Sequence, residues 1–225
     1  MRYLIDTADI PKIRRYTEYL PIAGVTSKPT IVKKEGRIDF FSHMKEIRTI
    51  IGDDAQLHIQ VSQKDFNGMM ADAKAILDNV DNRVYIKVPV TMEGIKTIKA
   101  LKKAGVNVTA TAVYSQAQAF MALEAGADCI APYFNRMEAM GIDAAEVIAN
   151  IAHIIDRNNY PTQILAASFK NVAQIDRAIL AGAQEITSDP DVFETALSVQ
   201  TVSDAVDVFC GDWHEVFGEA TIAEL

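Results

Sequence analysis

One lysine interrupts an apolar, β-branched run. Lys87 stands within Val84–Val90 (VYIKVPV), a pattern typical of a buried strand. Burial disfavours an ammonium group, and a neutral amine can attack a carbonyl carbon to form an imine. Two alternatives are a lysine whose head reaches solvent from the strand end and a lysine paired structurally with Asp6. The run alone leaves all three open.

Other polar residues follow strand-like runs and have types that could assist an amine. Asp6 could orient the amine and handle protons, or it could cap a helix that begins near Asp9. Gln60, Thr111 and Tyr133 could together hold a water molecule, with Tyr133 relaying a proton. Each of these three could equally be a satisfied polar group at a strand end.

A second group of residues has the chemistry of anion binding. Arg136 and Ser168 offer a guanidinium and a hydroxyl of the kind that bind phosphate, and we expect Ser168 near a helix N-terminus. The alternatives are a surface arginine and a helix cap. Thr26, Thr109 and Asn135 are further polar candidates at strand ends.

These residues belong to eight short apolar runs bounded by turn residues. Helical patterns separate the runs, and strict alternation favours parallel pairing. We therefore predict an α/β fold, a (β/α)₈ or TIM barrel, in which reacting groups gather at the C-terminal ends of the strands. A doubly wound sheet is the alternative, but no Gly-x-Gly-x-x-Gly turn follows the first run. The runs span 2–7, 22–27, 56–61, 83–90, 107–114, 129–134, 163–168 and 185–188.

Local signals refine these elements. Thr91 is a predicted cap and Gly105 a predicted stop for a helix over 92–104. Strand alternation predicts that Ser168 shares a face with Ala166. After the last run, 189–225 forms an extended C-terminal helical segment whose apolar face covers the barrel or a neighbouring subunit.

Composition restricts the class of protein. The 225 residues suit one domain, 1–225, and the net charge of −8 argues against nucleic acid or an anionic membrane as the main partner. The chain has two widely separated cysteines and no export signal, so we expect a cytoplasmic protein. Its four histidines lack metal-ligand spacing, and we expect no metal.

Six ordered segments resemble the transaldolase family, and within it the short bacterial branch of fructose-6-phosphate aldolases. The resemblance spans nearly the whole chain. The segments are Leu4–Thr7, Ala23–Ser27, Ile86–Thr91, Thr111–Tyr114, Ala131–Arg136 and Ala166–Lys170.

The resemblance implies roles for the candidate residues. Lys87 matches the family's Schiff-base lysine, and Asp6 matches its acid/base or orienting residue. Gln60, Thr111 and Tyr133 match the residues that hold a catalytic water. Transaldolases generally have glutamate and phenylalanine at the first and last of these positions, so Gln60 and Tyr133 favour the aldolase branch.

The resemblance also implies a reaction and an assembly. It implies a metal-independent enzyme without cofactors that reversibly cleaves fructose 6-phosphate to dihydroxyacetone and glyceraldehyde 3-phosphate. Arg136 and Ser168 match the phosphate-binding positions. Transfer of a dihydroxyacetone unit from sedoheptulose 7-phosphate is the alternative reaction. The partners implied are small sugar phosphates and copies of the same chain, with a decamer as the expected homo-oligomer.

One residue departs from the family pattern. After Gly24-Val25-Thr26 the chain reads Ser27-Lys28-Pro29, whereas the family has asparagine at position 28, where it helps to bind the donor's hydroxyl. Lys28 could lower the pKa of Lys87, recruit a more anionic substrate or disrupt donor binding, which would leave a sugar-phosphate-binding barrel with impaired catalysis. It could also point to solvent or pair with a carboxylate.

Overall fold

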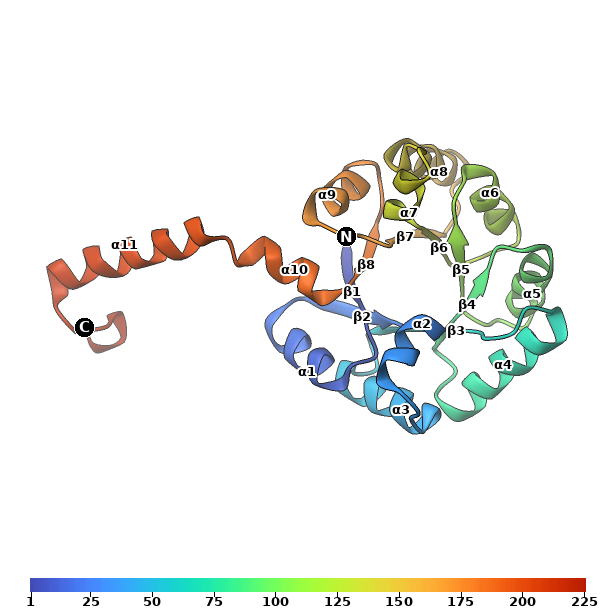
Figure 1. Cartoon of the computed structure of the whole chain (residues 1–225), viewed down its shortest axis with the longest axis horizontal. Helices are drawn as coiled ribbons and strands as arrows, with labels where there is room; N and C mark the ends of the chain where they lie inside the picture. The colour runs from blue at the N-terminus through green and yellow to red at the C-terminus, as the bar shows by residue number, and fades with distance from the viewer.

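Eight parallel strands close into a barrel in sequence order, and helices surround it (Figure 1). The computed structural model describes all 225 residues. Closure confirms the predicted (β/α)₈ barrel and excludes the doubly wound sheet. The strands are β1 (Arg2–Asp6), β2 (Ile22–Thr26), β3 (Gln56–Gln60), β4 (Tyr85–Pro89), β5 (Val108–Val113), β6 (Cys129–Pro132), β7 (Gln163–Ala167) and β8 (Glu185–Ser188).

Most of the α-helices begin at a polar side-chain cap, as the predicted cap Thr91 illustrates. Its hydroxyl accepts a hydrogen bond from Gly94 N, and Gly105 follows the helix with a positive φ of 74°. The helical elements are α1 (Ile10–Tyr19), α2 (Pro29–Val32), η1 (Lys33–Glu35), α3 (Phe40–Ile51), α4 (Phe66–Asn79), α5 (Met92–Lys103), α6 (Gln116–Glu124), α7 (Phe134–Ala139), α8 (Ala144–Asn158), α9 (Val172–Leu180), α10 (Pro190–Leu197), α11 (Gln200–Phe217) and η2 (Ile222–Glu224).

The barrel wall separates two apolar clusters. The larger one, with 41 buried residues, joins one face of the strands to the surrounding helices. The smaller one, Leu4, Cys129 and Leu165 with Tyr85 against them, fills part of the barrel interior. Most apolar burial therefore lies outside the barrel wall, which leaves the interior room for polar side chains.

A chain of polar contacts crosses the barrel interior. The guanidinium of Arg2 pairs with buried Glu185, whose Oε1 accepts from Gln56 Nε2 at 3.1 Å. Gln56 Oε1 lies 2.9 Å from His58 Nε2, and His58 Nδ1 lies 2.8 Å from Thr109 Oγ1. Burial, reinforced by the charge of the nearby lysine on β4, holds the pKa of His58 well below its ordinary value. The imidazole is therefore neutral.

Two predicted strand ends need correction. Strand β6 ends at Pro132, so the prediction of strand through 134 is wrong: Tyr133 turns the chain and Phe134 begins α7. Strand β7 ends at Ala167, and Ser168 has a left-handed backbone with φ of 66°. Alternation stops there, so the prediction that Ser168 shares a face with Ala166, which belongs to the outer cluster, is also wrong.

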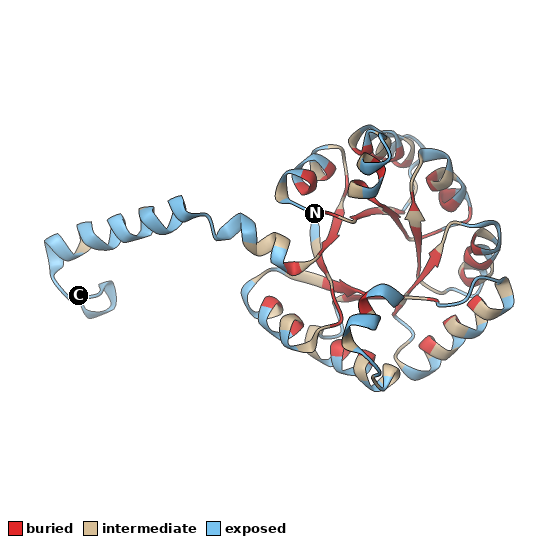
Figure 2. Cartoon of the chain, in the orientation of Figure 1, coloured by how far each residue is buried: buried red, intermediate tan, exposed pale blue.

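The C-terminal segment leaves the barrel. Helix α11 extends away from the body as an arm (Figure 1), and no residue of α11 is buried (Figure 2). Within the segment 189–225, α11 therefore does not cover its own barrel, whereas Val192 and Phe193 of α10 pack against the core. None of the helices, α11 included, combines the length and the apolar character needed to span a bilayer.

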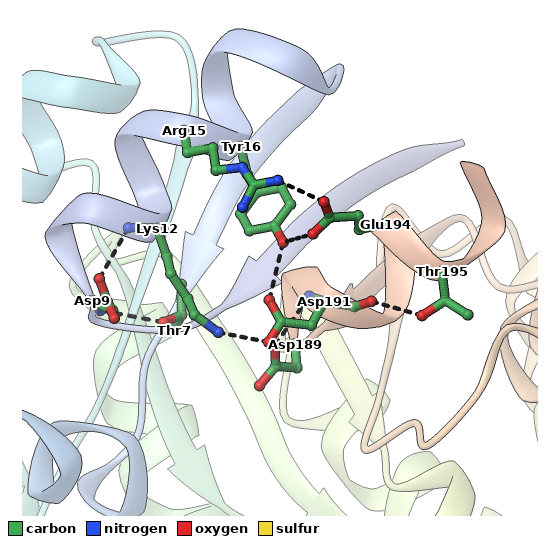
Figure 3. Close-up of polar contacts among 9 residues, drawn as sticks. All are labelled: Thr7, Asp9, Lys12, Arg15, Tyr16, Asp189, Asp191, Glu194 and Thr195. Atoms are coloured by element: carbon green, nitrogen blue, oxygen red, sulfur yellow. Dashed lines mark hydrogen bonds and ion pairs between the residues drawn. The ribbon is translucent and has the colours of Figure 1, made fainter. Parts of the chain in front are cut away.

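Helix α10 fastens the base of the arm to α1 (Figure 3). Lys12 Nζ lies 2.7 Å from Asp191 Oδ2, and Arg15 Nη2 lies 2.6 Å from Glu194 Oε1. The hydroxyl of Tyr16 reaches both carboxylates, with 3.0 Å to Asp191 Oδ1 and a close contact to Glu194. Burial and these two acceptors raise the pKa of Tyr16. Helix α10 is thus part of the barrel's outer layer, whereas α11 is not.

Candidate active site

The strand register brings the predicted residues to one end of the barrel. Asp6 pairs in register with Thr26, and Lys87 pairs with both Gln60 and Thr109. Register partners in neighbouring strands point to the same face. These side chains therefore face the interior near the C-terminal ends of β1 to β5.

Lys87 is enclosed. It is 2% exposed, which excludes a side chain whose head reaches solvent. Burial lowers the pKa of Lys87 from 10.5 to about 8, with an opposing effect from Asp6 and a further lowering by Lys28. At neutral pH a usable fraction of this amine is unprotonated, which is what attack on a carbonyl requires.

Asp6 is held by two partners from β2 and its loop. Its Oδ1 accepts from Thr26 Oγ1 at 2.7 Å, and its Oδ2 pairs with the ammonium of Lys28. The alternative of Asp6 as a helix cap is wrong, because Asp9 caps α1 by accepting from Lys12 N. Direct pairing of Asp6 with Lys87 is also wrong, because Lys28 takes that place.

Three neutral polar groups lie around the same end of the barrel. Thr111 Oγ1 lies 3.0 Å from the hydroxyl of Tyr133, and both side chains are buried. Gln60 Oε1 is buried without a hydrogen-bond partner. A buried polar atom of this kind needs a water or a ligand, so Gln60 offers an open acceptor position. A bulge at Ala112, with φ of 58°, redirects β5 just after Thr111.

The phosphate candidates follow β6 and β7, with Arg136 at the start of α7 and Ser168 on the loop after β7. Asn135 N donates to Ser168 O at 2.8 Å, so the two segments meet. Arg136 lies on α7, where Nη1 donates to Tyr114 OH at 3.0 Å and the guanidinium stacks over the ring of Tyr133 at 5.0 Å. Its other N–H groups remain available to an anion.

Two other candidates already use polar atoms within the protein. The hydroxyl of Thr109 contacts His58 in the interior chain. Asn135 Oδ1 accepts from Gln174 Nε2 at 3.1 Å, and Gln174 also donates to Glu138, so Asn135 belongs to a contact network between α7 and α9.

Sequence reasoning missed residues of β8. Thr187 Oγ1 lies 2.7 Å from Thr26 Oγ1 and so supports the Asp6 carboxylate indirectly, and Ser188 Oγ is buried without a partner. The available signal is the alternation of the polar residues Glu185 and Thr187 in the predicted strand 185–188, because it places two polar side chains on one face.

A side cavity of about 460 Å³ adjoins this end of the barrel. Lys28 and Gln60 contribute to its wall, together with Phe40 and Phe41 at the start of α3. Lys87 does not line this cavity. Lys28 and Gln60 therefore lie between the barrel interior and this cavity outside β3.

Comparisons with known proteins agree with the fold and with the resemblance described above. The family model for transaldolase/fructose-6-phosphate aldolase matches residues 3–221. A Streptococcus pneumoniae protein named "Probable fructose-6-phosphate aldolase" is 47% identical over 222 residues, which cover 99% of this chain and 100% of that protein. The chain is therefore an enzyme of the aldolase/transaldolase type and belongs to the transaldolase/fructose-6-phosphate aldolase family.

Proposed function

We propose that the chain is a class I aldolase that reversibly cleaves fructose 6-phosphate to dihydroxyacetone and glyceraldehyde 3-phosphate through a Schiff base on Lys87. The observation that carries this proposal is the enclosed Lys87 amine, whose pKa is about 8 and which has no ion-pair partner. The name of the S. pneumoniae relative supports the choice of substrate.

The proposed cleavage begins with attack of the neutral Lys87 amine on the C2 carbonyl, and water leaves as the imine forms. The C4 hydroxyl then loses its proton while the C3–C4 bond breaks. The bonding electrons move into the protonated imine to give an enamine, and glyceraldehyde 3-phosphate departs. Protonation of the enamine at C3 and hydrolysis of the imine release dihydroxyacetone and restore Lys87.

The proton transfers are assigned to groups near Lys87. Asp6 orients substrate hydroxyls and handles their protons. Gln60, Thr111 and Tyr133 hold a water molecule, with the Tyr133 hydroxyl passing the proton. The support is the 3.0 Å contact between Thr111 and Tyr133 and the unpartnered Gln60 Oε1.

The remaining candidates are assigned to substrate binding. Arg136 and Ser168 bind the phosphate, since the guanidinium keeps free donors and Ser168 lies on the adjoining loop. Thr26 and Lys28 face the donor end of the substrate. Thr109 and Asn135 contribute at the edges of the site while retaining their contacts with His58 and Gln174.

Borohydride reduction in the presence of dihydroxyacetone or fructose 6-phosphate tests the proposal. We expect a stable adduct on the peptide that carries Lys87 and none in Lys87→Met. An adduct on Lys28 instead would move the chemistry to the loop after β2. No adduct with either ketone would rule out the Schiff base.

Transaldolase activity is the second candidate, because the matched family model covers both reactions. Both use Lys87, so they are separated by the acceptor. An aldolase releases free dihydroxyacetone from fructose 6-phosphate without an added aldose phosphate, whereas a transaldolase turns over only when an acceptor is present. Binding of fructose 6-phosphate without formation of product in either assay would indicate a sugar-phosphate-binding barrel whose catalysis is impaired by Lys28.

We also propose that the chain forms a homo-oligomer, with a decamer as the expected form, in the cytoplasm. The support for assembly is the exposed apolar stripe of α11, which the same barrel does not cover. The support for the compartment is the pair of free cysteines, Cys129 and Cys210.

A further inference from the structure

Both oxygens of the Asp6 carboxylate are occupied. Thr26 Oγ1 donates to Oδ1 at 2.7 Å and is itself 2.7 Å from Thr187 Oγ1. The ammonium of Lys28 pairs with Oδ2. The side chains of Lys28 and Asp6 are 23% and 12% exposed, so the pair is shielded from most of the solvent screening that weakens surface ion pairs.

This arrangement leaves Lys87 without a counter-ion. Lys87 is 2% exposed, and its ammonium has no ion-pair partner among the acidic side chains. The acidic group of β8, Glu185, is paired with Arg2 in the interior chain. The charged or titratable groups that act on Lys87 or are acted on by it are Asp6 on β1, Lys28 after β2 and His58 on β3.

We propose that Lys28 is a positioning residue for the Schiff-base reaction: it holds Asp6 away from Lys87, so that the buried amine keeps no counter-ion and is available for attack at neutral pH. This inference rests on the proposed function. In this role Lys28 helps to activate the amine of Lys87 and does not itself contact the reacting carbon.

The charges around Lys87 agree with this role. Asp6 raises the pKa of Lys87 and Lys28 lowers it. Removing the Lys28 charge should therefore raise the pKa of Lys87 in two ways. The direct repulsion between the two ammonium groups disappears, and the freed Asp6 carboxylate can approach Lys87. A Lys28–Asp6 pair that contributed only to stability and did not act on Lys87 would leave the titration of Lys87 unchanged.

The test measures the titration of Lys87 in the free enzyme. Trace acetylation with acetic anhydride across a pH series, followed by peptide mass mapping, reports the neutral fraction of each lysine. We compare the full-length protein with Lys28→Met, which removes the charge, and Lys28→Arg, which retains it. We expect the Lys87 midpoint to rise by about one pH unit in Lys28→Met and to return in Lys28→Arg. An unchanged midpoint in Lys28→Met would overturn the inference.

A second readout separates this inference from the proposed function. Borohydride trapping with dihydroxyacetone is carried out on the same three proteins at neutral and alkaline pH. We expect Lys28→Met to form roughly tenfold less Lys87 adduct at neutral pH and to recover at alkaline pH. Equal trapping in Lys28→Met and the unmodified protein at neutral pH contradicts the role of Lys28 alone. No Lys87 adduct in any protein at any pH contradicts the proposed function itself.

Discussion

The neutral fraction of Lys87 controls the first chemical step, so catalysis must depend on pH. Only the neutral amine attacks, and its pKa is about 8. We expect kcat/KM for fructose 6-phosphate to rise about tenfold per pH unit at low pH and to level off above the pKa. Initial rates across the range measure this limb. A limb centred near 10.5, the ordinary value for lysine, would show that burial does not activate Lys87.

The same residue should reduce the stability of the fold. Because the folded state disfavours the ammonium, burial of Lys87 destabilises the protein fully below pH 8, and the effect disappears as the pH rises toward 10.5. We expect Lys87→Met to raise the free energy of unfolding by roughly 2–3 kcal/mol at neutral pH, with a smaller gain at alkaline pH. Denaturant titration measures the difference. The exposed Lys99→Met on α5 is the matched control and should show no gain.

Phosphate recognition by Arg136 predicts a selective kinetic defect. Arg136→Met should raise KM for fructose 6-phosphate roughly tenfold, because a charge-assisted contact is lost. Reaction of unphosphorylated glyceraldehyde with dihydroxyacetone should be almost unaffected. Steady-state kinetics with both substrates measure the contrast, and Arg157→Met on the exposed face of α8 is the control. Equal losses for both substrates would argue against phosphate binding.

At the scale of elements, the contact between α1 and α10 fixes how the chain leaves the barrel. Tyr16→Phe removes the hydroxyl shared by Asp191 and Glu194, and we expect it to destabilise the fold by about 1 kcal/mol. Thermal and denaturant unfolding measure this loss. Tyr19→Phe, on the same helix but 73% exposed, should have no effect. A similar loss of stability in both variants would show that the contacts of the Tyr16 hydroxyl with Asp191 and Glu194 are not its cause.

The elements were largely predictable because buried parallel strands form short β-branched runs. Each of the eight runs contains a strand of the barrel. The convergence of Asp6, Gln60 and Lys87 was also predictable, since parallel strands bring their C-terminal ends to one side. The ends of β6 and β7 were not, because Tyr133 and Ser168 leave the extended conformation while keeping strand-like neighbours.

Long-range partners were the other part that sequence could not supply. Lys28 had several open roles, and only the closed barrel shows that its carboxylate is Asp6. Thr187 contacts Thr26 across the β1 position, and these residues are far apart in the chain. The path of α11 was undetermined for a related reason: an amphipathic pattern indicates that a face is buried without indicating which surface covers it.

At the scale of the whole molecule, α11 presents an apolar stripe to solvent. Val202, Val206, Phe209 and Val216 recur at helical spacing and are each at least 50% exposed. If a second copy covers this stripe, Val206→Asp should lower the assembly mass, because a charge would be buried in an apolar contact. Light scattering coupled to size exclusion measures the mass. Ser203→Asp adds the same charge beside the stripe and should leave the mass unchanged.

The polar chain through the barrel interior also has a direction. Gln56 donates its Nε2 to Glu185, so its Oε1 must accept, and the neutral His58 carries its proton on Nε2. His58 Nδ1 is then an acceptor, which obliges the hydroxyl of Thr109 to donate to it. Thr109 can therefore offer only a lone pair toward its neighbours in the site. The ion pair of Arg2 and Glu185 at the far mouth of the barrel thus sets the orientation of a hydroxyl hydrogen beside Lys87.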